Sequence, residues 1–210
     1  MNNFKNTRTL VSYLRKFITG KTVDFGAGNA KYRNLIKPCT SEYVAFDMIE
    51  GEHIDVVGDA LNPPFPDSTF DTVLSTQTLE HVEKPWVVVS EIKRILKQDG
   101  ICIITAPFLI PYHADPYDFF RYTKQGLESL FKNEGFEIVE SGTYGNTPSV
   151  LVEMLHFSHF SHYTHRSKWR GRIRNAFIRS TKWLAYKLDT VFKNKSVYAN
   201  SYVVARKVRP

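Results

Sequence analysis

The chain has few cysteines and no long apolar run, and both absences exclude whole classes of protein. Cys39 and Cys102 are its two cysteines, too few for a disulfide framework and without the spacing of a metal-binding motif. The longest apolar stretch, 101–112, is interrupted by Pro107 and Pro111 and is too short to cross a bilayer. The basic N-terminal residues lack the apolar core of a signal peptide. We therefore expect a single cytoplasmic domain over residues 1–210, with no metal site.

An even spread of positive charge is also missing, although the net charge is +7. Residues 147–197 contain ten Lys and Arg against Glu153 and Asp189, a local charge of +8, so that the remaining residues sum to −1. The basicity belongs to one segment and not to a surface that could follow a nucleic acid along the whole protein. This distribution disfavours nucleic acid as the main partner.

Apolar runs and helical spacing alternate along the chain. The runs predict strands at 22–25, 43–47, 54–57, 70–75, 101–106, 136–142 and 201–207. Helical spacing predicts helices over 7–18, 29–36, 85–97 and about 123–133, with Thr123 as a cap and with Gly100 and Gly135 as glycine stops. Strands separated by helices of this length predict a doubly wound α/β fold, with a mostly parallel sheet and helices on both of its faces.

The first functional signal is the sequence Asp24-Phe25-Gly26-Ala27-Gly28, placed where the first strand turns into a helix. Glycines at such a turn let the backbone approach a ligand closely, and the next helix offers free N–H groups. Asp47 ends the second strand at the same edge of the sheet, where a carboxylate can accept both hydroxyls of a ribose. These residues predict a nucleotide-like cofactor, either a dinucleotide or S-adenosylmethionine.

The segments that follow favour S-adenosylmethionine over a dinucleotide. Lys31 stands where the dinucleotide fingerprint has its third glycine. The chain continues through Gly58-Asp59-Ala60, a proline-rich loop at 62–71, Thr78-Leu79-Glu80-His81-Val82 and Ile95-Leu96-Lys97-Gln98-Asp99-Gly100. In this order the segments resemble the class I S-adenosylmethionine-dependent methyltransferases of the type 11 group. The likeness covers residues 20–145 and the closing strand.

The resemblance implies a Rossmann-like seven-stranded sheet in the order 3-2-1-4-5-7-6, with the last strand antiparallel, and S-adenosylmethionine as cofactor. It implies that Asp24, Gly26, Ala27 and Gly28 surround the methionine part. Asp47 would bind the ribose and Met48 would lie against the adenine. Asp59 and the N–H of Ala60 would contact the adenine edge, and Thr76 and Gln77 would face the sulfonium end. The substrate cannot be inherited from such a likeness.

Residues 111–123 contain the candidates for catalysis. This loop follows the fifth strand, on the edge where the cofactor is expected. We expect His113 to act as the general base for an oxygen or nitrogen acceptor, with Asp118 and Arg121 orienting it or the acceptor. The alternative is that Asp118 and Arg121 form an ion pair that braces the loop.

Residues 147–197 form a basic amphipathic helical insertion before the last strand. Between 168 and 193, apolar residues that include Trp and Phe recur at helical spacing among Lys and Arg. Such a segment either lies in a membrane interface or packs its apolar stripe on the domain. Its position favours a lipid-linked or amphipathic acceptor, such as a glycan precursor on a lipid carrier, and a location at the inner face of the membrane. A soluble small-molecule or sugar acceptor is the first alternative, and a non-catalytic membrane-recruited binding protein is the second.

Overall fold

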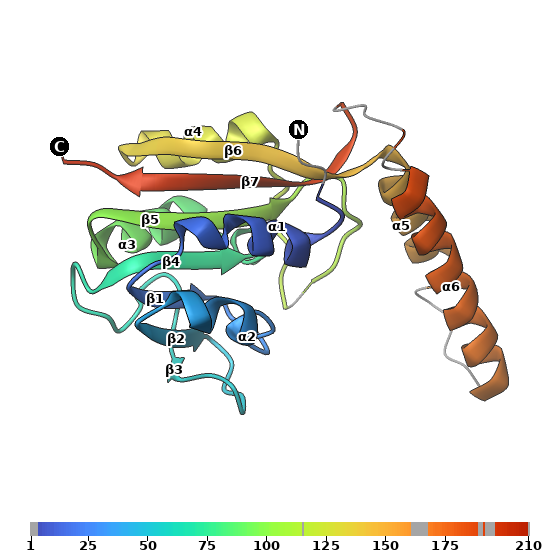
Figure 1. The fold of residues 1–210 in the computed structure, drawn as a ribbon, viewed down its shortest axis with the longest axis horizontal. Coiled ribbons are helices and arrows are strands. Elements are labelled where there is room, and N and C mark those ends of the chain that lie inside the picture. Colours follow the sequence, from blue (N-terminus) through green and yellow to red (C-terminus); the bar gives the residue numbers. More distant parts are fainter. Residues whose placement is uncertain (1–3, 115, 161–167, 189–190, 192–195, 210) are drawn as a thin grey trace.

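The computed structural model describes residues 4–114, 116–160, 168–188, 191 and 196–209. Seven strands form one sheet in the order β3-β2-β1-β4-β5-β7-β6 (Figure 1). All neighbours from β3 to β5 are parallel, whereas β7 runs antiparallel to β5 and β6. The predicted order and the antiparallel last strand are confirmed. The strand bounds are β1 Lys21–Phe25, β2 Glu42–Asp47, β3 Val56–Val57, β4 Phe70–Thr76, β5 Leu96–Pro107, β6 Phe136–Asn146 and β7 Tyr198–Lys207.

Two apolar clusters hold helices against opposite faces of the sheet. Successive strand residues point to opposite faces, so Val73 belongs to one cluster and Leu74 to the other. The first cluster packs under α3 (Pro85–Ile95) and α4 (Lys124–Asn133), and the second under α1 (Thr7–Leu14) and α2 (Arg33–Ile36). Figure 1 shows these two layers. The predicted doubly wound fold is therefore correct.

Several predicted boundaries were wrong. The helix predicted over 29–36 begins only at Arg33, because Ala30 takes a left-handed φ of 46° and residues 27–30 form a turn. The first helix changes to a 3-10 turn after Leu14. Gly100 does not stop a helix: α3 ends at Ile95 and β5 begins at once with Leu96. The Thr123 cap is confirmed, since its hydroxyl accepts a hydrogen bond from Gly126 N at 3.0 Å.

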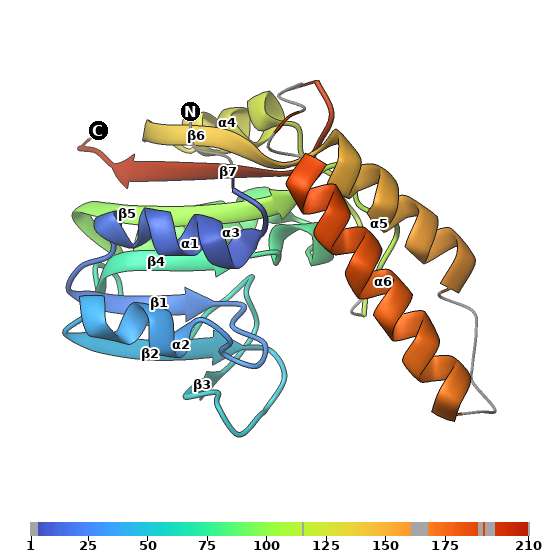
Figure 2. The same ribbon diagram turned by 45° about the vertical axis from the view of Figure 1, so that its right-hand side comes forward.

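Residues 147–188 contribute two helices, α5 (Thr147–Phe160) and α6 (Lys168–Leu188), which lie side by side and extend away from the sheet (Figure 2). They are joined by Lys182 to Glu153 at 3.1 Å and by Thr181 to His156 at 2.9 Å. Among the stripe residues of α6 whose side chains the structure describes, Phe177, Leu184 and Leu188 remain exposed. We call α5 and α6 together the helical hairpin. Large apolar side chains that stay exposed on it are Leu151, Met154, Leu155, Phe177, Trp183, Leu184 and Leu188.

Within the described residues, no helix combines the length and the apolar character that a membrane span requires. Part of the predicted 168–193 stripe, residues 189–190 and 192–193, lies outside the part of the chain that the structure describes.

Candidate active site

The glycine turn after β1 fits closely against the loop after β4. Gly26 has a φ of +75°, and a Cβ there would lie 2.3 Å from the Thr78 hydroxyl, so no other residue fits without displacing Thr78. The N–H groups of Gly26 and Ala27 both donate to Phe46 O, at 2.9 and 3.0 Å. Gly28 also has a positive φ, but a Cβ on it would meet nothing within 4 Å. The turn is thus packed on one side and open at Gly28.

Asp47 joins this turn to the end of β2. One carboxylate oxygen accepts a hydrogen bond from Gly28 N at 2.7 Å, and the other accepts from Ile49 N at 3.0 Å. The backbone therefore positions the carboxylate beside the glycine turn, where the sequence predicted a ribose-binding acid. Asp59 is held similarly, because its side chain accepts from Leu61 N at 2.8 Å.

Asp24 is buried under the turn with only 1% of its surface exposed. The Tyr43 hydroxyl donates to one of its oxygens at 2.7 Å. The other oxygen has no hydrogen-bond partner among the described residues. Burial raises the pKa of Asp24 to about 6, against the opposing effect of the Tyr43 hydrogen bond. The site therefore contains a carboxyl group whose charge is poorly balanced by the residues around it.

A cavity of about 470 Å³ opens at the carboxyl ends of β1, β2 and β4. This is the edge at which doubly wound sheets bind their ligands. Seven of the predicted cofactor residues line it: Gly26, Gly28, Asp47, Met48, Asp59, Ala60 and Gln77. The other three, Asp24, Ala27 and Thr76, are buried next to lining residues and do not contribute to the wall. The far side of the cavity is formed by His81, Val82, Pro116, Tyr117 and Phe119.

The predicted catalytic residues lie together, but not on the cavity wall. Arg121 forms a bidentate ion pair with the side chain of Asp118, which is buried. Arg121 also donates to Ile110 O and Pro111 O, both at 3.1 Å. Asp118 also accepts from His113 N at 2.8 Å, and the Arg121 guanidinium lowers the pKa of Asp118 to about 2. These contacts brace the loop as the alternative interpretation predicted. The His113 ring does not hydrogen-bond to Asp118, since the nearest atoms are 3.8 Å apart.

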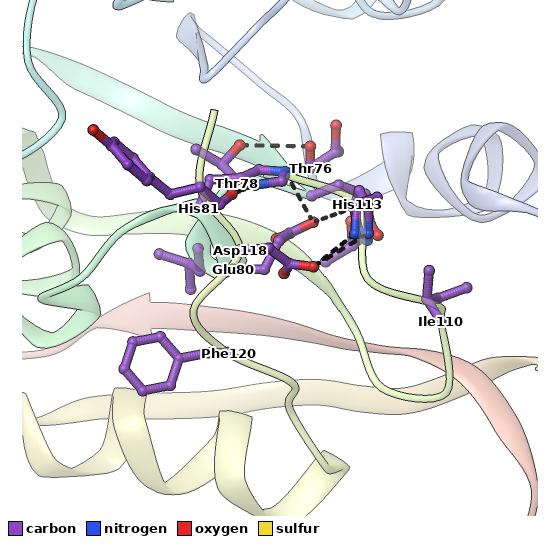
Figure 3. A network of polar contacts seen from close by, with 12 residues as sticks. Thr76, Thr78, Glu80, His81, Ile110, His113, Asp118 and Phe120 are labelled. Atoms are coloured by element: carbon purple, nitrogen blue, oxygen red, sulfur yellow. Dashed lines mark hydrogen bonds and ion pairs between the residues drawn. The ribbon is translucent and has the colours of Figure 1, made fainter. Parts of the chain in front are cut away.

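Glu80 is the residue that the sequence analysis missed. It is fully buried in the short 3-10 turn Leu79–His81, and burial raises the pKa of its carboxyl group to about 8. Nε2 of His81 and Nε2 of His113 lie 3.8 and 3.9 Å from its Oε1 (Figure 3). The sequence analysis expected no metal site. In the structure, ligand atoms of Glu80, His81 and His113 all lie within 4.8 Å of one another. The only sequence signal of this cluster was the pair Glu80-His81, an acid directly before a histidine just after a buried strand.

Comparisons with known proteins agree with this architecture. A family model described as "Methyltransferase domain" matches residues 23–104. An uncharacterized protein of Methanocaldococcus jannaschii is 30% identical over 148 residues, 65% of this chain and 65% of that protein. A demethylmenaquinone methyltransferase of Anoxybacillus flavithermus is 37% identical over 84 residues, 38% of this chain and 35% of that protein. A crystal structure of an S-adenosylmethionine-dependent methyltransferase from Archaeoglobus fulgidus has a TM-score of 0.61 at 18% identity, covering 96% and 95% of the two chains.

The strand order, the glycine turn and the matched domain define a class I methyltransferase, the class that uses S-adenosylmethionine. Within that class the chain resembles the type 11 group over residues 23–104, the part that the family model matches. The matches span 65% and 35% of the lengths of the two relatives, so what those proteins do as a whole does not transfer directly.

Proposed function

We propose that this chain transfers the methyl group of S-adenosylmethionine to a small-molecule acceptor bound at the His81–Phe119 side of the cavity. The observation that carries the proposal is that Gly28, Asp47, Asp59 and Gln77, which lie at or just after the ends of four separate strands, line one cavity. Its volume of about 470 Å³ lies within the range of about 300–1,000 Å³ that is typical of small-molecule sites.

The residues present fit the cofactor chemically. Asp47 offers carboxylate oxygens beside the open Gly28 position, as ribose hydroxyls require. Asp24, buried directly behind the glycine turn, supplies a negative charge that attracts the cationic end of the cofactor without lining the cavity. Met48 is 62% exposed beside the cavity and can cover a flat base. When bound, S-adenosylmethionine supplies a methyl group that is already activated by the sulfonium.

Positioning is the main contribution that we propose for the protein. Holding donor and acceptor in line replaces a bimolecular encounter, and little covalent chemistry is needed from side chains. Tyr117 and Phe119 provide apolar walls where the acceptor would lie. The base role of His113 stays a prediction. His113→Ala should slow turnover while cofactor affinity persists, and unchanged turnover would contradict that role.

An amphipathic or lipid-linked acceptor is the form of substrate that we favour, together with contact between the hairpin and an anionic membrane surface. Phe177, Leu184 and Leu188 follow one another by seven and four residues, so they share a face of α6. All three are more than a third exposed, and the exposed Arg172, Arg179 and Lys187 lie on the same helix. The curated relative from Anoxybacillus flavithermus is a demethylmenaquinone methyltransferase, which is consistent with this acceptor class.

Two assays test these proposals. Calorimetry should detect micromolar binding of S-adenosylmethionine and S-adenosylhomocysteine but not of NAD, and Asp47→Ala should abolish it while the exposed control Glu52→Ala does not. No binding by folded protein would favour a non-catalytic role.

Sedimentation with anionic liposomes at low salt should carry down the wild type but not the double variant Phe177→Ser/Leu184→Ser. A failure of the wild type to sediment would remove the membrane proposal and favour a soluble acceptor.

A further inference from the structure

Three ligating atoms converge beside the acceptor end of the cavity. Oε1 of Glu80 lies 3.8 Å from Nε2 of His81 and 3.9 Å from Nε2 of His113. The two histidine rings face each other edge to face, with their centroids 5.3 Å apart. Figure 3 shows Glu80, His81 and His113 gathered at one point, although 32 residues separate the two histidines.

The hydrogen bonds of both rings fix which nitrogen carries a proton. Nδ1 of His81 lies 2.5 Å from Tyr117 O, and Nδ1 of His113 lies 3.1 Å from Pro111 O. A carbonyl oxygen can only accept a hydrogen bond, so each Nδ1 is the donor and each Nε2 presents a lone pair in the neutral ring. Both Nε2 atoms therefore offer a lone pair within 3.9 Å of Oε1 of Glu80.

Three atoms that carry lone pairs and face one another form a site that a positive ion would stabilise. Neither oxygen of Glu80 has a hydrogen-bond partner among the described residues. Distances of 3.8 and 3.9 Å are too long for a proton shared between a nitrogen and the carboxylate. The guanidinium of Arg121 is already engaged by Asp118 and by the carbonyls of Ile110 and Pro111. Among the described residues, the three ligand atoms are therefore not engaged with a cationic side chain at hydrogen-bond distance.

The spacing suits a metal ion. Tetrahedral bonds of about 2.1 Å separate ligand atoms by about 3.4 Å. The two carboxylate–imidazole distances are 3.8 and 3.9 Å and all the ligand atoms lie within 4.8 Å of one another, so movements of about 0.5 to 1.5 Å would close the site. Two histidines and one carboxylate form a ligand set that divalent transition metals use with coordination positions left open. Each ring also donates its second nitrogen to a backbone carbonyl, which is the outer arrangement that metal-binding histidines usually have.

We propose that Glu80, His81 and His113 bind a divalent first-row transition-metal ion, such as Zn²⁺ or Mn²⁺, whose open positions hold two neighbouring oxygens of the methyl acceptor. The acceptor is then a vicinal diol, a catechol or a hydroxy acid. The part about the acceptor rests on the proposed methyl transfer, whereas the metal site does not.

The ion would make an acceptor hydroxyl acidic, as bound metals do for water. The hydroxyl loses its proton to solvent, the oxygen–methyl bond forms as the sulfur–methyl bond breaks, and the sulfonium leaves as the neutral thioether. In this arrangement His113 acts through the metal ion and not as a free base.

Cobalt titration of the chelator-treated full chain tests the site directly. Co²⁺ should give visible ligand-field bands that Zn²⁺ abolishes, and Glu80→Gln should weaken Co²⁺ binding by about 100-fold or more. His81→Phe provides a second variant should Glu80→Gln fail to fold. The control is His53→Ala, which removes an exposed histidine outside the cavity and should leave the bands unchanged. Equal Co²⁺ affinity of wild type and Glu80→Gln would overturn the proposal.

Catechol added to the cobalt-loaded protein tests the open positions. A change in the bands is expected, and unchanged bands would overturn the part about the acceptor. Calorimetry with S-adenosylmethionine on the same samples separates the two proposals. Cofactor binding without metal binding refutes only the metal site, and metal binding without cofactor binding refutes only the methyltransferase activity.

Discussion

Replacing Asp24 by asparagine should stabilise the folded chain at neutral and higher pH while weakening its affinity for S-adenosylmethionine. The carboxyl group is 1% exposed and receives one hydrogen bond, from Tyr43. Burial raises its pKa from 3.8 to about 6, so the folded state holds the proton more tightly than the unfolded state does. Asparagine keeps an oxygen that can accept the Tyr43 hydrogen bond and carries no charge.

The magnitude follows from the two pKa values. The rise in pKa corresponds to about 3 kcal/mol in the free energy of unfolding. The wild type loses this stability as pH rises from about 4 through about 6. About 1.5 kcal/mol of this loss falls between pH 5 and pH 8, where the chain can be studied conveniently. The amide nitrogen of the variant lacks an acceptor and costs about 1–2 kcal/mol at every pH, so the net gain near pH 8 is about 1–2 kcal/mol.

Urea unfolding near pH 5 and pH 8 measures the difference between Asp24→Asn and the wild type. The advantage of the variant should grow by about 1.5 kcal/mol between these conditions. Glu52→Gln, an exposed acid, should show no such growth. A difference that does not change with pH would refute the account of the buried charge. Calorimetry near pH 8 should show cofactor affinity lowered about tenfold, because the negative charge buried behind the glycine turn no longer attracts the cationic end of the ligand.

Two further substitutions and one labelling experiment have outcomes that the structure specifies. Gly26→Ala should destabilise the chain by about 2–4 kcal/mol in urea unfolding, since its Cβ would lie 2.3 Å from Thr78 at a φ of +75°. Arg121→Ala should cost about 3–5 kcal/mol at neutral pH, because Asp118 is left buried without its cation. That loss should shrink as pH falls from about 4 toward 2, where the lowered pKa of Asp118 no longer favours the folded state, and a loss independent of pH would contradict the ion-pair account. Cys102, which is fully buried with a raised thiol pKa, should react with a thiol reagent only after unfolding, and rapid labelling of folded protein would disprove its burial.

Sequence reasoning predicted the parts of the fold that local patterns determine. The apolar runs gave all seven strands, and Thr123 capped the helix that it was expected to cap. It placed the Asp24–Gly28 turn and Asp47 at one edge of the sheet because parallel strands bring their carboxyl ends together. Errors arose where one residue decides a boundary. The left-handed φ of Ala30 shortened α2, and β5 continues directly from α3 although Gly100 suggested a stop.

The cluster around Glu80 could not be predicted in the same way. His113 reaches it only because the loop after β5 folds back over the turn after β4. The spacing of apolar residues along the sequence does not predict a long-range contact of this kind. Three contacts fix the fold-back: Phe119 N to Glu80 O at 2.7 Å, Tyr122 OH to Leu79 O at 3.1 Å, and His81 to Tyr117 O.

These contacts also connect the chemistry of the cluster to the shape of the cavity. Tyr117 and Phe119 form the cavity wall at the proposed acceptor end, and both are held by backbone bonds to His81 and Glu80. We expect an ion bound by the cluster to shift the backbone of Tyr117 and Phe119 through these bonds. Substitutions at Glu80 should therefore alter acceptor selectivity together with metal affinity, whereas substitutions at Asp47, on the opposite side, should alter cofactor affinity alone.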